Sequence, residues 1–141
     1  MAGTAPKPLL AFPEGRNLGS EACASCHPAQ HKQWRKSPHG KARKSLKAKG
    51  SDKDAACVAC HATAKVDAPS TAADYHSGGV GCESCHGPGE KHVAAGGGSE
   101  NIVGLGSSCP ECVIEGICTT CHDGEQDPDW DLKRDLPKVH H

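Results

Sequence analysis

The sequence predicts a mostly α and irregular fold with little or no β-sheet. Its short helices and loops would wrap around bound groups that take the place of an apolar core. Three observations lead to this prediction. The 141 residues include only two Trp, one Tyr and one Phe, so a conventional apolar core is hard to fill. They include 10 Cys and 10 His instead, and bound groups or cross-links would have to supply the missing cohesion. No segment alternates apolar and polar residues as a half-buried strand does.

Two helices are expected early in the chain. The first covers Pro28–Lys36 and is ended by Ser37 and Pro38, because proline cannot continue a helix. The second covers Lys41–Lys49 and is closed by Gly50, the residue type that most often ends a helix. Both helices are short, which suits a chain that wraps around other groups.

Two further helices are predicted from capping residues. Ser51 or Asp52 would cap a helix that carries the sequence CVACH. Asp127 followed by Pro128 reads as an N-cap and a first-turn proline, opening a turn or two that ends at Asp135. The glycines at 96–98 predict a loop between these elements.

Charge is balanced in total but uneven along the chain. The formal net charge of -1 suggests neither nucleic acid nor an acidic membrane surface as a partner. Nine of the 16 Lys and Arg lie between His31 and Lys53, and eight of the 17 acids lie in Glu111–Asp135. These are either two solvated faces or two docking surfaces of opposite sign. No apolar run approaches membrane-spanning length, and the first residues do not read as a signal peptide.

One motif, CxxCH, occurs four times: CASCH at 23–27, CVACH at 57–61, CESCH at 82–86 and CTTCH at 118–122. Two thiols at this spacing add to the vinyl groups of haem, and the next imidazole binds the iron. A zinc or iron–sulfur site needs no histidine after each cysteine pair. The motifs therefore predict four covalently attached haem c groups. The cysteines are Cys23, Cys26, Cys57, Cys60, Cys82, Cys85, Cys118 and Cys121. The proximal histidines are His27, His61, His86 and His122.

The second axial position of each iron is expected to hold histidine. Met1 is the only methionine, which leaves little room for Met ligation. Six other histidines are available for four places: His31, His39, His76, His92, His140 and His141. Iron with two histidine ligands has a low potential and no open position for a substrate.

Two stretches resemble the nitrifier tetrahaem cytochrome family. GVGCESCHGPGEKH at 79–92 matches its CxxCH, Gly-Pro-Gly, His pattern, and CASCHPAQHKQWRKSPHGKA at 23–42 matches its CxxCH, Trp, Ser-x-His pattern. The final PKVHH is similar to the ending of many relatives. The resemblance covers most of Ala22–His141. It implies a small haem-wrapping domain over 22–141, preceded by an extended segment at 1–21.

The resemblance also implies axial ligands. His39, twelve residues after His27, would serve the third haem, and His92, six residues after His86, would serve the first. The glycines of Gly-Pro-Gly would let the chain turn sharply and deliver His92, which would hold these two haems as a close pair.

The remaining ligand positions follow less directly. His141 would complete the fourth haem, with His140 as the alternative, and His76 would serve the second. In the type member of the family one haem lacks a sixth ligand, so the second haem is where the pattern is least secure. His31 stands where relatives carry an apolar or aromatic residue and is taken as structural.

A fifth cysteine pair, Cys109 and Cys112, departs from the motif because Val113 follows it. A local disulfide is the plain interpretation in an oxidising compartment. A redox-active dithiol and a metal half-site are the alternatives.

These features predict electron transfer between redox partner proteins rather than catalysis. A head-to-tail homo-oligomer or an extracellular filament is a further hypothesis, in which the basic and acidic segments or the terminal histidines join subunits. The alternative function is a haem enzyme with one open iron that reduces a small nitrogen or sulfur oxide. Because haem c is attached outside the cytoplasm, we expect a periplasmic or extracellular protein.

Overall fold

The computed structural model describes residues 11–106 and 109–139. Within them the chain forms seven short α-helices and three 3-10 helices, joined by loops. The α-helices are α1 (Pro28–Lys36), α2 (Ala42–Ala48), α3 (Ala55–His61), α4 (Cys82–His86), α5 (Glu90–Ala94), α6 (Glu111–Cys118) and α7 (Leu132–Asp135). The 3-10 helices are η1 (Ser20–Cys23), η2 (Ala72–Asp74) and η3 (Leu136–Lys138).

The described residues contain no strand, and an isolated antiparallel bridge joins Ala64 and Tyr75. The expected mostly helical fold with little or no β-sheet is therefore confirmed. The glycines at 96–98 lie in a loop, also as expected.

The first two helices agree with the sequence. α1 has the predicted bounds, and it ends because Ser37 is extended and the next residue is proline. α2 is one residue shorter at each end than predicted, and Gly50 follows it with φ 73°, a conformation that glycine adopts without strain.

Two predicted caps were wrong. The helix that carries CVACH is present as α3, but its N-cap is Asp54, whose Oδ1 accepts the Ala56 N–H at 2.9 Å. α7 begins at Leu132 after Asp131, which accepts the Arg134 N–H at 2.8 Å. Asp127 is not the cap because its carboxylate is bound to His122 at 2.9 Å.

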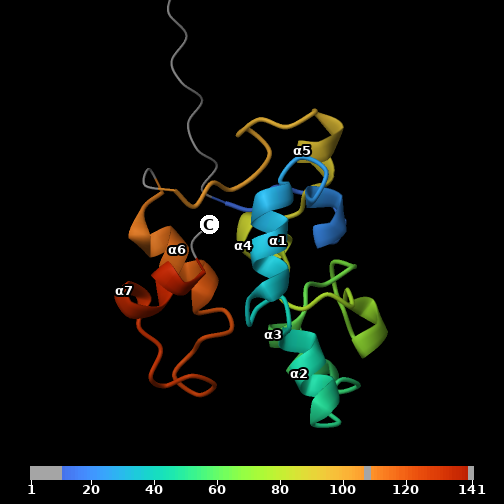
Figure 1. Cartoon of the computed structure of the whole chain (residues 1–141), viewed down its shortest axis with the longest axis vertical. Coiled ribbons are helices and arrows are strands. Elements are labelled where there is room, and N and C mark those ends of the chain that lie inside the picture. Colours follow the sequence, from blue (N-terminus) through green and yellow to red (C-terminus); the bar gives the residue numbers. More distant parts are fainter. Residues whose placement is uncertain (1–10, 107–108, 140–141) are drawn as a thin grey trace, which may run out of the picture.

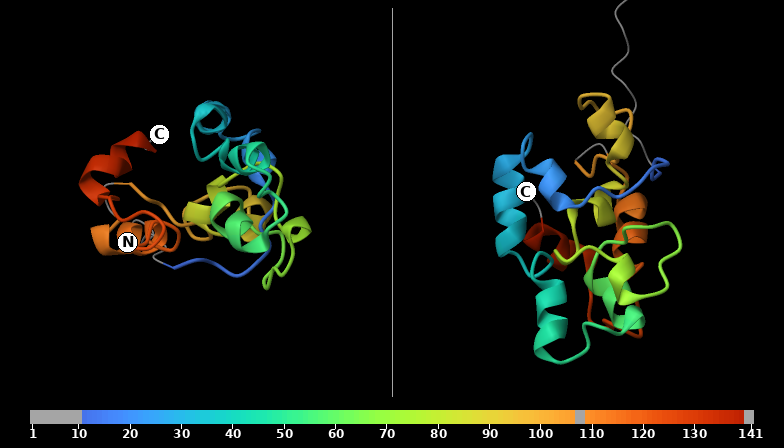
Figure 2. Two further views of the ribbon diagram at one scale, coloured as in Figure 1. Left: turned by 90° about the horizontal axis from the view of Figure 1, so that it is seen from below. Right: turned by 90° about the vertical axis from the view of Figure 1, so that its right-hand side faces the viewer.

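The helices form two groups, with α4 between them (Figures 1 and 2). Residues 11–103, called here the network region, contain α1 to α5. Residues 104–139, called here the C-terminal lobe, contain α6 and α7 and are drawn in orange and red. The side chains at the core are few, as the composition predicted. The main cluster joins α2, α3 and the bridge through Leu46, Val58, Ala62 and Tyr75.

None of the helices in the described ranges has the length and apolar character that a membrane crossing requires.

Candidate haem-binding site

Thiols from different CxxCH motifs lie next to one another in the structure. The first motif meets the third, because a hydrogen bond from the Cys23 thiol lowers the pKa of Cys82 to about 6 and raises the pKa of Cys23. The third meets the fourth, since burial and the nearby Cys118 thiol raise the pKa of Cys85 to about 11. The motifs are thus brought next to one another, although they are spread over 100 residues of sequence.

The fourth motif also meets the second. Burial, followed by the hydrogen bond to the Cys60 thiol, raises the pKa of Cys121 to about 12. Neighbouring thiols therefore link the motifs in the order first, third, fourth, second.

In three of the four motif histidines, the Nδ1 atom is hydrogen-bonded to an oxygen. His61 Nδ1 lies 3.0 Å from the Ala42 carbonyl oxygen, and His86 Nδ1 lies 2.6 Å from that of Val103. His122 Nδ1 lies 2.9 Å from the Asp127 carboxylate. These oxygens accept, so Nδ1 carries a proton in each case. Metal-bound histidines are oriented in this way in proteins.

The residues present fit haem c at these three motifs. Each supplies two thiols at the attachment spacing and an imidazole that donates from Nδ1. The first motif differs, because Cys26 and His27 are exposed, with His27 at the N-cap of α1. Sequence reasoning did not identify the oxygens of Ala42, Val103 and Asp127 as partners.

The ring of His39 faces the fourth motif. Its centroid is 6.0 Å from that of His122 at an interplanar angle of 50°, and burial followed by the charge of His122 lowers the pKa of His39. Two imidazoles on opposite sides of one metal, each at about 2 Å from it, have centroids roughly 6 Å apart. The backbone carbonyl of His39 accepts the Val80 N–H at 2.9 Å, next to the third motif. The ring of His39 therefore lies beside the fourth motif, while its backbone lies beside the third.

His92 lies on α5 and has a buried Nδ1 atom with no hydrogen-bond partner. A buried polar atom without a partner is costly, which marks a place where a bound group is expected. Gly87, in the Gly-Pro-Gly turn before it, has φ 86°, and a Cβ there would lie 2.8 Å from Pro13 Cδ. The turn therefore requires glycine, as the sequence suggested.

His76 is held differently. Its backbone N–H donates to the Thr63 carbonyl at 2.8 Å, two residues after the second motif. Its Nε2, however, lies 3.1 Å from the carbonyl oxygen of Asn17, so that atom is engaged by the N-terminal segment. The backbone of His76 therefore lies close to the second motif, but its Nε2 atom is occupied by the Asn17 carbonyl in this structure.

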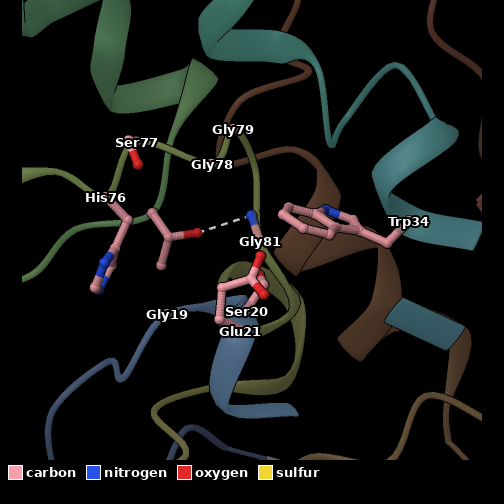
Figure 3. A pocket seen from close by; sticks show the side chains of 10 residues that line it. Gly19, Ser20, Glu21, Trp34, His76, Ser77, Gly78, Gly79 and Gly81 are labelled. Atoms are coloured by element: carbon pink, nitrogen blue, oxygen red, sulfur yellow. Dashed lines mark hydrogen bonds between the residues drawn. The ribbon is translucent and has the colours of Figure 1, made fainter. Parts of the chain in front are cut away.

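Figure 3 shows a small pocket between η1 and the loop that leads to α4, with His76 and Trp34 on opposite sides. A dashed line marks the bond from Gly81 N–H to the Thr63 hydroxyl, at 2.8 Å. The cavity has a volume of ≈ 110 Å³, below the roughly 300 Å³ from which pockets accept small organic ligands. It is not a haem pocket.

His31 is buried with 7% of its side chain exposed, and its Nε2 lies 3.4 Å from a Glu21 carboxylate oxygen. His140 and His141 lie outside the described residues. Cys109 and Cys112, at the start of α6, are both free, so the disulfide expected between them is not formed in this structure. Burial raises the pKa of the Cys109 thiol.

Comparison with known proteins agrees with the motifs. Residues 22–87 match the family model described as cytochrome c554 and c-prime. The chain is 33% identical over 110 residues to cytochrome c-554 of Nitrosomonas europaea. That alignment covers 57% of this chain, which spans less than half, 45%, of the relative. No solved structure gives a significant match. The predicted resemblance is thereby confirmed: residues 22–87 are similar to the cytochrome c554 and c-prime family.

Proposed function

We propose that the chain is a tetrahaem c-type cytochrome that relays electrons between redox partner proteins. The observation that carries the proposal is the common placement of His61, His86 and His122, each with Nδ1 on an oxygen. This arrangement orients an imidazole for iron, and a hydrogen bond at Nδ1 raises its strength as a ligand. The bound haem would supply one-electron chemistry, while the chain sets ligands, spacing and exposure.

We assign the axial ligands from both the resemblance and the ring placements. His39 opposes His122 at the fourth haem, supported by the 6.0 Å separation of their rings. His92 serves the first haem, as the resemblance implies; its Nδ1 is buried without a protein partner. The resemblance gives His76 to the second haem, which requires its Nε2 to leave the Asn17 carbonyl when the haem is bound. His141, or His140, is assigned to the remaining third haem by elimination alone.

The thiol contacts suggest the path that electrons take. The first and third motifs adjoin through Cys23 and Cys82, and the fourth and second adjoin through Cys121 and Cys60. We propose two close haem pairs joined between the third and fourth haems, which gives one continuous relay.

The proposal is tested by intact-mass measurement and spectroscopy of the protein purified from a host that attaches haem c. We expect the mass of the chain plus four haems and a low-spin spectrum. A mass with fewer haems would refute the tetrahaem assignment.

The second candidate function is reduction of a small nitrogen or sulfur oxide at an open iron. The observation that favours it is the bond between His76 Nε2 and the Asn17 carbonyl, which occupies the atom that iron would need. A high-spin ferric signal for one haem in four, with binding of nitric oxide or carbon monoxide, would support this function. A wholly low-spin spectrum would support electron transport alone.

Charge suggests how partners dock. The exposed lysines and arginines of α1 and α2 form a basic surface, and the acids of the C-terminal lobe form an acidic one. Such surfaces steer redox partners, and their opposite signs allow identical subunits to join head to tail, as an oligomer or filament. We place this assembly outside the cytoplasm, in the periplasm or at the cell exterior. Sedimentation at low and high salt tests it, because a charge-driven assembly should dissociate as salt rises.

A further inference from the structure

Glu83 is a buried carboxylate in the middle of the third motif, between Cys82 and Cys85. Only 4% of this residue is exposed. Glutamate is almost never fully buried unless it is paired. Haem attachment needs only the two cysteines and the histidine of the motif, so it does not explain this burial.

Three backbone N–H groups donate to the Glu83 carboxylate. Oε1 accepts from Gly19 at 2.7 Å, and Oε2 accepts from Leu18 at 2.8 Å and from Gly89 at 2.7 Å. An ionised carboxylate is a pure acceptor and can satisfy all three donors. The charge also makes these bonds stronger than ordinary ones.

The donors belong to segments that carry other haem-binding residues. Leu18 and Gly19 immediately precede η1, whose last residue is Cys23 of the first motif. Gly89 is the N-cap of α5, which carries His92. Glu83 thus ties its own motif to the first motif and to the proposed axial ligand of the first haem.

Other contacts reinforce the same junction. The Cys82 N–H donates to the Ser20 hydroxyl at 3.1 Å, and Arg16 pairs with Glu90 at 2.6 Å. A Cβ on residue 89 would lie 3.3 Å from Glu83 Oε2, a tight contact, so the carboxylate takes the space that a side chain there would fill. The sequence around the third motif is therefore built to receive this carboxylate.

We propose that Glu83 is a positioning residue that fixes the first and third haems and His92 relative to one another, and that its charge lowers the potentials of those two haems. The inference rests on the proposed haem attachment. A negative charge in a poorly solvated interior favours the oxidised, more positive iron.

The test compares Glu83→Gln with Glu100→Gln in the haem-loaded full chain. The control removes the same charge from an exposed residue. Intact mass is measured first. We then expect the potentials of two haems to rise in Glu83→Gln by about a tenfold change in the reduction equilibrium, about 59 mV for one electron. Its Tm should fall, because the Gln amide nitrogen cannot accept a backbone N–H.

Four haems with unchanged potentials in Glu83→Gln would overturn the inference and leave the proposed function intact. A wild-type protein without haem would instead overturn the proposed function.

If Glu83→Gln does not mature, Gly89→Ala keeps the test decisive, because it retains the charge and crowds the carboxylate. Gly104→Ala is its matched control, since a Cβ there meets nothing within 4 Å. We expect a lower Tm and an altered low-spin signal of one haem for Gly89→Ala alone. Identical behaviour of the two variants would overturn the inference.

Discussion

The network region and the C-terminal lobe are held together in different ways. In the network region, hydrogen bonds join segments far apart in sequence, such as Leu18 with Glu83 and Trp34 with Val80. In the C-terminal lobe, the hydrogen bonds found among its described side chains are local, such as those of His122 with Asp127 and of Arg134 with Asp135. Apart from the Cys121 thiol, the described side chains of the lobe therefore form hydrogen bonds within the lobe rather than with the network region.

The two regions meet at cysteines of the CxxCH motifs and at the rings of His39 and His122. Cys60 contacts Cys121, Cys85 lies near Cys118, and the ring of His39 faces His122. From this comparison we infer that protein contacts order the network region, whereas placement of the lobe would depend on the haem proposed at its motif.

The largest difference between the two regions is expected when the haem-attachment cysteines of the C-terminal lobe are removed. In Cys118→Ala/Cys121→Ala we expect the loss of one haem and rapid proteolysis between residues 104 and 139, with the network region spared. Intact mass and limited proteolysis measure both. Cys109→Ala/Cys112→Ala, in the same lobe, should keep all four haems. Equal protease resistance of the two double variants would contradict the dependence on haem.

The next largest effect is expected at His39, which bridges the regions. His39→Ala should convert one haem in four to the high-spin state, because its iron loses a ligand. Electron paramagnetic resonance measures the change. His31→Leu is the control. It replaces a buried histidine near His39 in sequence and should leave the spectrum low-spin. A low-spin spectrum for both variants would remove His39 from the ligand set.

The two regions also differ in how they hold their motif histidines. His122 is bound to a carboxylate, whereas His61 and His86 are bound to neutral carbonyls. The carboxylate gives the imidazole more negative character and should lower the potential of the fourth haem. Asp127→Asn should therefore raise one potential, by less than the change at Glu83, because the Asp127 side chain is 41% exposed. Spectroelectrochemistry would contradict this expectation if no potential moved.

The smallest effect concerns a loop of the network region. Hydrogen bonds from the Ser70 and Thr71 backbones lower the pKa of Asp74 below its ordinary 3.8. A depressed pKa means that the carboxylate stabilises the fold above pH 3.8 and loses this contribution as pH falls through the folded value. Asp74→Ala should lower the Tm slightly at pH 7, and the difference should vanish in acid. A difference that is constant with pH would show that the charge is not involved.

The sequence predicted the attachment residues because CxxCH is a local pattern that chemistry alone demands. It could not predict which oxygen atoms accept hydrogen bonds from the Nδ1 atoms of the motif histidines. The Ala42 and Val103 carbonyls reach His61 and His86 only after the chain folds back, and a backbone carbonyl leaves no trace in the sequence. Asp127 lies only five residues after His122, so a contact between them could have been expected. The proline that follows Asp127 instead favoured its interpretation as a helix cap.

The side-chain direction of His39 shows a similar limit. Its backbone does contact Val80 beside the third motif, which is where the resemblance placed it. The direction of its side chain, toward His122, depends on the whole turn between α1 and α2. The burial of Glu83 was equally hidden, because haem attachment places no requirement on the two middle positions of CxxCH.

The most direct test of the whole account is the mass of the intact native protein, compared with that of the bare chain of 141 residues. We predict an increment of four haem groups that survives denaturation, since thioether bonds are covalent. An increment of three or fewer, or one that is lost on denaturation, would contradict it.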